Sequence, residues 1–229
     1  MVPQSVSAFR TSCRATFSRY YSGFAHLLFT GITAISVIFY AFWRARGASW
    51  LQLSVIPIAF LYANLVEYLS HRNPMHRPIK PISIMFDRHT LSHHKFFTNE
   101  AMSFERSDDF QMILFPPRML LAFFVAALLP AGVLDYFFSR TSALLFVGVG
   151  MAYYLLYECL HFTYHLNENT FIGRLWIIKK LRQHHIVHHN PRLMNRYNFN
   201  ITFPIFDYVL GTVYRGDGNV LPNEPLKSG

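Results

Sequence analysis

The chain has 229 residues, of which 52% are hydrophobic, 17% aromatic and only 14% charged. Soluble domains carry about 25% charged residues, so this composition leaves too little charge to cover a soluble fold of this size. The formal net charge of +9 would suit nucleic acid, but the basic residues lie beside apolar segments, which favours anionic lipid headgroups instead. The two cysteines, Cys13 and Cys159, form no CxxC motif and predict neither a disulfide framework nor a thiolate metal site.

Residues 1–22 form a basic arm ahead of the first apolar run. No small-residue cleavage site follows that run, so we interpret it as a retained membrane span and not as a signal peptide. The arm is followed by an expected membrane domain over residues 23–215 and a polar tail over residues 216–229.

Four apolar segments are each long enough to cross a bilayer, which takes about 20 residues per helix. The links between the first and second segments, and between the third and fourth, are short, so the four helices are expected to form two hairpins. Prolines 116 and 117 predict that the third helix begins near Arg118. The predicted fold is therefore an all-α integral membrane protein, with spans over residues 23–43, 49–69, 113–137 and 141–160.

Basic residues are distributed unequally between the two sides of these spans. The side that holds the N-terminus, residues 70–118 and everything after 161 carries 18 of the 21 Lys and Arg residues. The positive-inside rule predicts that this side, which also carries the histidine clusters, is cytoplasmic. Amphipathic patterns over 83–97 and 171–189 predict helices that form a cap at this membrane surface.

Eleven of the twelve histidines fall into four short clusters, which are His71-x4-His76, His89-x3-His93-His94, His161-x3-His165 and His185-x2-His188-His189. Residues three or four apart share a helix face, which predicts that the members of each of the last three clusters point the same way. In the first cluster, Asn73 and Pro74 predict that the helix ends between the two histidines.

Ten imidazoles are more than one ion can bind, whereas two ions with about five nitrogens each would use them all. His184 competes with His185 for a place in the set, and we favour His185. His26, alone in the first span, is expected to be a polar residue and not a ligand, and no catalytic residue is expected beyond the metal ligands. The predicted ligands are His71, His76, His89, His93, His94, His161, His165, His185, His188 and His189.

Four carboxylates lie near the clusters in sequence. Glu67 precedes His71 by one helical turn, and Glu158 lies three residues before His161. Such carboxylates commonly accept the ring N–H of a ligating histidine, and we expect this role for Glu67 and Glu158 and also for Asp87 and Asp207. Direct ligation by Glu158, as in the Glu-x-x-His motif of ferritin-like di-iron bundles, is an alternative.

The series HRNPMH, HTLSHH, HFTYH and HHIVHH, followed by YNFNITFPIFDYVLGT, resembles the fatty acid hydroxylase/sterol desaturase superfamily. Asp207, Gly211 and Thr212 match the C-terminal signature of that superfamily, and the resemblance covers about residues 60–215. It implies a four-helix membrane domain with a cytosolic cap, a di-iron centre with two Fe ions, O₂ as co-substrate and a lipid as substrate.

A neutral all-histidine shell suits Fe(II), and oxidation of an unactivated C–H bond needs a metal that activates O₂. Some superfamily members carry a fused cytochrome b5 domain, for which this chain has no room. Electrons are therefore expected from a separate donor, such as a ferredoxin, cytochrome b5 or reductase. A cationic face formed by Arg72, Arg77, Lys179, Lys180 and Arg182 is the expected docking site for an acidic donor.

Other functions remain open on the sequence. A desaturase or an aldehyde-converting enzyme of the same superfamily would use the same oxidant, and the substrate is open among acyl chains, sterols, sphingoid bases, carotenoids and aminolipid headgroups. The sequence also leaves the oligomeric state open. A membrane metal-binding or transport protein is disfavoured because transporters place ligands near the bilayer midplane, whereas these clusters lie at helix ends. A zinc hydrolase needs an open site on one ion and not ten ligands.

Overall fold

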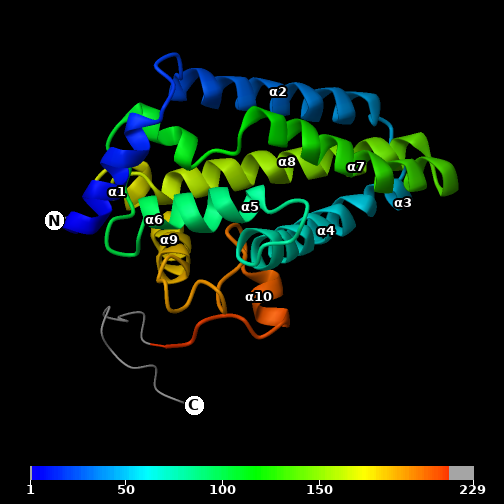
Figure 1. The fold of residues 1–229 in the computed structure, drawn as a ribbon. Helices are drawn as coiled ribbons and strands as arrows, with labels where there is room; N and C mark the ends of the chain where they lie inside the picture. The colour runs from blue at the N-terminus through cyan, green and yellow to red at the C-terminus, as the bar shows by residue number, and fades with distance from the viewer. Residues whose placement is uncertain (1, 217–229) are drawn as a thin grey trace. The chain divides into compact units, whose positions relative to one another are not determined.

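The computed structural model describes residues 2–216, and in that part of the chain the regular secondary structure is helical (Figure 1). An isolated antiparallel bridge joins Thr98 and Ala101. The all-α prediction is therefore confirmed. The chain divides into two compact units: a bundle unit of residues 17–66 and 106–162, and a histidine unit of residues 1–16, 67–105 and 163 onward.

Four helical stretches are long and apolar enough to cross a membrane, as the sequence predicted. They are Gly23–Arg44, Trp50–Met75, Ser107–Phe137 and Arg140–Tyr164. Their regular helices are α2 (Gly23–Arg44), α3 (Trp50–Leu53), α4 (Val55–Ser70), η3 (Ser107–Met112), α7 (Pro117–Phe137) and α8 (Arg140–Tyr164).

The helices of the bundle unit begin where the local sequence directs. Ser22 precedes α2 and its hydroxyl oxygen accepts a hydrogen bond from the Ala25 N–H at 3.3 Å, which satisfies one of the free donors of the first turn. Ser49 and Gln52 form a reciprocal capping box at the start of α3. Pro117 opens α7, one residue before the predicted start, because the first turn of a helix needs no N–H from that residue.

Helix α8 lies at the centre of the bundle unit and packs against its other long helices (Figure 1). One apolar cluster joins α8 to α4 and α7 through small side chains, among them Ala59, Ala131 and Ala143. A second cluster, formed by Ala34, Leu120, Met151 and Tyr154, joins α8 to α2 and α7. Small residues let helix backbones approach closely, which is the usual way membrane helices pack.

The opposite faces of these helices carry large apolar side chains that are exposed. On α2 and α7 they include Phe24, Leu28, Leu121 and Leu129, the last of which is 78% exposed. Such a surface is unfavourable in water and suits the hydrocarbon of a bilayer. The protein is therefore an integral membrane protein.

The histidine unit is built from short helices joined by loops. They are α1 (Gln4–Ala15), η1 (His71–Met75), α5 (Ile84–Phe86), η2 (Asp87–His93), α6 (His94–Phe96), η4 (Ile172–Arg174), α9 (Trp176–His188) and α10 (Ile205–Val209). In Figure 1, α1 lies against α6. The predicted polar tail after Gly216 lies outside the described residues.

The histidine unit differs from the sequence prediction in two places. The helix does not end between His71 and His76, because residues 71–75 continue α4 as a wide π-helical turn that contains Pro74. Proline removes a backbone donor and crowds the preceding turn, and a wider turn relieves this crowding. The predicted helix over 171–189 is divided, because Leu175 is extended (φ −60°, ψ 131°) between η4 and α9.

Candidate metal centre

The histidines of the histidine unit converge in two buried groups. The first group consists of His71, His76, His89, His94 and His188, whose ligand nitrogens lie within 4.8 Å of one another. Nitrogens of His93, His165, His185 and His189 are equally close to one another and form the second group. All nine imidazoles are buried. Sequence clusters and spatial groups are therefore different sets, because two of the clusters contribute to both groups.

Two π-helical turns explain much of this sorting. A π-helix is bonded from residue i to residue i+5, so residues five apart face the same way. His71 and His76 bracket η1, and their Nε2 atoms are 3.2 Å apart. His89 lies in η2 and His94 follows it, and their Nε2 atoms are 3.0 Å apart. His93, which α-helical spacing paired with His89, belongs instead to the second group.

Helix α9 supplies both groups from its last turn. His185 and His189 are four residues apart, and their Nε2 atoms lie 3.0 Å from each other in the second group. His188 turns to the first group, where its Nε2 lies 2.9 Å from that of His76. The rings of His185 and His188 are stacked with their centres 6.0 Å apart, as expected for one helix face, but the shared face did not predict that the two residues belong to different groups.

Three rings of the first group have their tautomers fixed by oxygen acceptors. The Nδ1 atoms of His71 and His188 donate to the backbone carbonyls of Phe199 and Tyr197, the latter at 3.1 Å. The Thr90 hydroxyl donates to a carbonyl and therefore accepts from Nδ1 of His76 at 3.2 Å. A ring that donates from Nδ1 carries a free lone pair on Nε2 when it is neutral. These lone pairs face one another.

The second group is arranged in the same way by a different stretch of chain. His165 donates from Nδ1 to the Met102 carbonyl at 2.7 Å, and His189 donates to the Phe97 carbonyl at 2.6 Å. Their Nε2 atoms each lie 3.0–3.3 Å from Nε2 of His185. In each group the rings that donate from Nδ1 therefore turn an unprotonated Nε2 toward their neighbours, and lone pairs that face each other repel unless a cation lies between them.

The nitrogen–nitrogen distances fit such a cation. Across the two groups, Nε2–Nε2 contacts range from 2.8 Å, between His71 and His89, to 3.3 Å, between His165 and His185. Neighbouring ligands at right angles on one ion are about 3.0 Å apart when metal–nitrogen bonds are about 2.1 Å. The residues present therefore fit two metal ions with nitrogen ligands.

Burial also keeps these imidazoles in their metal-binding form. Desolvation lowers the pKa of His76, His89, His94, His188 and His189 below 6.5, and the positive charge of neighbouring imidazolium groups would lower it further. Neutral imidazole binds transition metals and imidazolium does not. The histidine unit thus holds its nitrogens ready for metal without first having to lose protons at neutral pH.

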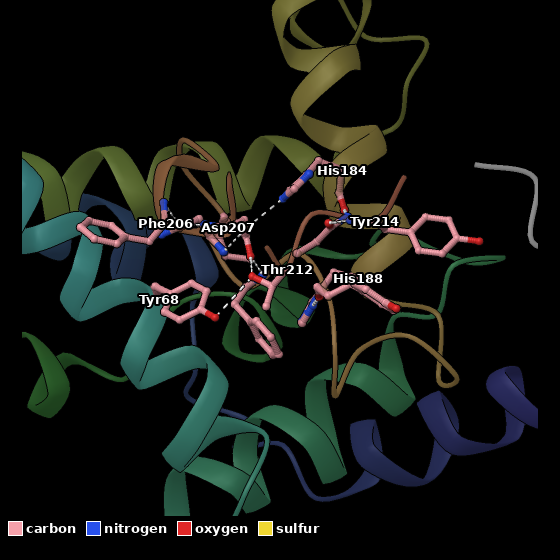
Figure 2. Close-up of polar contacts among 12 residues, drawn as sticks. Tyr68, His184, His188, Phe206, Asp207, Thr212 and Tyr214 are labelled. Atoms are coloured by element: carbon pink, nitrogen blue, oxygen red, sulfur yellow. Dashed lines mark hydrogen bonds and ion pairs between the residues drawn. The ribbon is translucent and has the colours of Figure 1, made fainter. Parts of the chain in front are cut away.

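Asp207 fixes the loop whose carbonyls hold the first group. It is fully buried and accepts hydrogen bonds from the backbone N–H of Phe199 and Asn200 at 2.9 and 2.8 Å. It also accepts from the Thr212 hydroxyl at 2.7 Å and lies 3.3 Å from Nε2 of His184. Figure 2 draws Asp207 between these two residues. Asp207 therefore acts through the backbone, because Phe199, which it holds by the N–H, receives Nδ1 of His71 at its carbonyl.

Glu67 has a similar contact to the same loop. Its carboxylate accepts from the backbone N–H groups of Ile201 and Thr202 and from the Thr202 hydroxyl, the last at 2.7 Å. The two acidic residues together hold residues 199–202 in place. The sequence led us to expect that Glu67 and Asp207 accept the ring N–H of a ligating histidine directly. In the structure both carboxylates instead bind backbone N–H groups of the loop, and the carbonyl of Phe199 in this loop contacts His71.

The other two predicted carboxylates lie elsewhere. Glu158 is buried in the bundle unit, where it accepts from the Phe115 N–H and the Tyr154 hydroxyl, both at 3.0 Å. Asp87 is exposed at the start of η2. These positions give neither residue a described hydrogen bond to a histidine.

The remaining histidines are placed as follows. His184 is outside both groups and faces Asp207, whereas His185 lies in the second group. His161 is buried on α8 in the bundle unit, four residues before His165. His26 lies in the bundle unit between the Tyr21 hydroxyl at 2.9 Å and the Phe115 carbonyl at 3.0 Å.

One of the five basic residues that were predicted to form a cationic face is buried. Arg77, Lys179 and Lys180 are exposed and Arg72 is half-buried, but Arg182 is only 7% exposed. Arg182 donates to the Ser103 hydroxyl at 3.4 Å inside the histidine unit. It therefore does not belong to a docking surface, because it lies on the inner side of α9.

Comparison with known proteins gives two matches. The model of the family described as "Fatty acid hydroxylase" matches residues 56–212, which include all ten predicted ligands. A solved structure of full-length Scs7p, in which only the hydroxylase domain is visible, is similar in fold with a TM-score of 0.63 and 18% identity over 89% of this chain and 70% of that one. No curated protein sequence matches the chain significantly.

Proposed function

Because the chain belongs to the fatty acid hydroxylase family, we propose that it is a membrane-bound, O₂-dependent di-iron enzyme that hydroxylates a lipid. The observation that carries this proposal is the pair of buried imidazole groups, in which neighbouring Nε2 atoms lie 2.8–3.3 Å apart. A redox metal is needed to oxidise an unactivated C–H bond, and nitrogen donors of this kind suit Fe(II).

The ligand assignment follows the two groups. His71, His76, His89, His94 and His188 hold one iron, and His93, His165, His185 and His189 hold the other. The fifth ligand of the second iron is His161, which lies one helical turn before His165 on α8. When bound, the two irons supply the activation of O₂. The protein keeps the imidazoles neutral, fixes the orientation of His71, His188, His165 and His189 through carbonyl acceptors, and excludes bulk water by burial.

Substrate and sidedness are further parts of the proposal. The exposed apolar faces of α2 and α7 suit a bilayer environment, and this supports the proposal of a lipid substrate that reaches the enzyme through the membrane. The excess of Lys and Arg beside the histidine clusters favours a cytoplasmic active site. A separate acidic electron donor is proposed to dock on Arg72, Arg77, Lys179 and Lys180.

Product analysis under ¹⁸O₂ tests the proposal. Membranes that contain the protein, an electron donor and a lipid extract should yield a lipid that is heavier by one ¹⁸O atom, as measured by mass spectrometry. The matched control is the His188→Ala variant, which should yield no labelled product. A product that has instead lost two hydrogens would identify a desaturase, and a protein that binds no iron would refute the di-iron proposal.

A further inference from the structure

The N-terminal helix α1 lies outside the residues matched by the family model, yet it belongs to the histidine unit. Its residue Arg10 is only 1% exposed. A buried guanidinium is unfavourable unless its donors are satisfied, because the charge loses its hydration. The contacts of Arg10 therefore indicate why α1 packs where it does (Figure 1).

All three nitrogens of the Arg10 side chain donate to acceptors on one segment. Nε donates to the Phe96 carbonyl at 2.9 Å, Nη2 donates to the Ala101 carbonyl at 2.7 Å and Nη1 pairs with Glu105 at 2.8 Å. The guanidinium carbon also lies 5.2 and 5.4 Å from the ring centres of Phe96 and Phe97. A planar fork with donors in several directions suits this arrangement, and a lysine ammonium does not.

The segment clamped in this way carries the acceptors of the second histidine group. The Phe97 carbonyl follows directly after Phe96 and receives Nδ1 of His189, and the Met102 carbonyl follows Ala101 and receives Nδ1 of His165. The Phe104 N–H further donates to the His165 carbonyl at 3.0 Å. Arg10 thus binds the carbonyls of Phe96 and Ala101, and the residue after each of them carries an acceptor for a histidine ring.

We infer that Arg10 is a positioning residue for the second metal ion, through the Phe96–Met102 segment. The inference rests on the proposed function, since it assumes that the second group binds a metal. None of the first group's described acceptors lies in the clamped segment: Tyr197 and Phe199 are about 100 residues away, and Thr90 lies in η2, ahead of Phe96. Loss of Arg10 should therefore weaken one ion and spare the other, which a general loss of stability would not do.

The test compares Arg10→Ala and Arg10→Lys with two control variants in detergent under argon. Arg14→Ala removes a neighbouring arginine that shares two of the contacts of Arg10, the half-exposed Glu105 at 2.8 Å and the Phe96 ring at 5.5 Å, and so controls for the loss of those two contacts. Thr90→Val removes the acceptor of His76 in the first group. Each protein is titrated with ⁵⁷Fe²⁺ alone, bound iron is counted by mass spectrometry, and Mössbauer spectra report which iron environment is retained.

Wild type and Arg14→Ala are expected to bind about two irons. Arg10→Ala and Arg10→Lys should bind one iron at full affinity and the second about 10- to 100-fold more weakly, as for other residues that orient a ligand. Thr90→Val should weaken the other iron, with the opposite spectral component retained. If Arg10→Ala fails to fold, Arg10→Lys carries the comparison because it keeps the charge.

The outcomes separate the two proposals. Two irons of unchanged affinity and spectrum in both Arg10 variants would overturn this inference and leave the di-iron proposal intact. Equal weakening of both irons would also overturn it, because Arg10 would then act on general stability. A wild-type protein that binds no iron would overturn the di-iron proposal, and this inference with it.

Discussion

The two histidine groups have the same chemistry but different supports. In the first group, acceptors in the loop at Tyr197 and Phe199 hold the rings, and buried Asp207 holds that loop. In the second group, acceptors at Phe97 and Met102 hold the rings, and Arg10 holds their segment. The two histidine groups are thus supported by residues from opposite ends of the chain. A mutation in one support should therefore weaken iron binding in its own histidine group and leave the other group unchanged.

In both groups a buried charge acts through the backbone and not directly on a histidine. Backbone carbonyls can only accept, so they fix the tautomer of a histidine whatever its surroundings. A charged residue that bonds to the neighbouring peptide groups then holds the carbonyl in position. Asp207 and Arg10 have opposite charges because they hold opposite ends of the peptide unit, N–H groups in one case and carbonyls in the other.

The largest effect is expected from removing one ligand of each group. His188→Ala should leave an iron only in the second group, and His93→Ala should leave one only in the first. Both variants should lose lipid hydroxylation by more than about 100-fold, because removing a ligand costs more than removing a group that orients it. Iron content and Mössbauer spectra measure the first effect, and product yield measures the second. His26→Gln is the control, and full activity in either ligand variant would contradict the assignment.

A smaller effect, confined to the first group, is expected from Asp207→Asn. The amide has one acceptor oxygen where the carboxylate has two, and Asp207 has four described donors around it. The iron affinity of the first group should fall by about 10- to 100-fold and that of the second group should not change. An iron titration followed by Mössbauer spectroscopy checks this. Equal loss in both groups would show that the supports are not separate.

The stability of the metal-free protein should depend on pH in a defined direction. Burial lowers the folded-state pKa of His76, His89, His94, His188 and His189 below 6.5, so below pH 6.5 the unfolded chain binds more protons than the folded one. Stability should be constant above that pH and fall below it, by up to about 1.4 kcal/mol per pH unit for each histidine. Thermal unfolding of the metal-free protein at pH 7.5, 6.5 and 5.5 measures this. Equal midpoints at all three values would contradict it.

The smallest effect is expected from Asp87→Asn. Asp87 is exposed, and an exposed substitution changes stability by no more than about 0.5 kcal/mol. Iron content and hydroxylation should stay within about twofold of wild type, which makes this variant the matched control for Asp207→Asn. A loss of iron in Asp87→Asn would show that this carboxylate reaches the metal centre after all.

The sequence predicted the apolar spans and the identity of the clustered histidines. Both are properties of the residues themselves: about 20 apolar residues fit a bilayer only as a helix, and imidazoles at helical spacing converge. It did not predict which histidines lie together in each spatial group. His93 was paired with His89 by α-helical spacing, but the π-helical turns around it place His94 there instead.

Only the tertiary structure decided what holds the histidines in place. Carbonyls such as those of Phe97 and Phe199 have no side-chain signature, since every residue has a carbonyl, and Arg10 lies in an arm that the sequence patterns set apart from the membrane domain. The sequence by itself determined the helical membrane fold and identified the clustered histidines as candidate metal ligands. The division into two groups depends on where distant segments pack, because π-turns and buried hydrogen bonds form only in the folded chain.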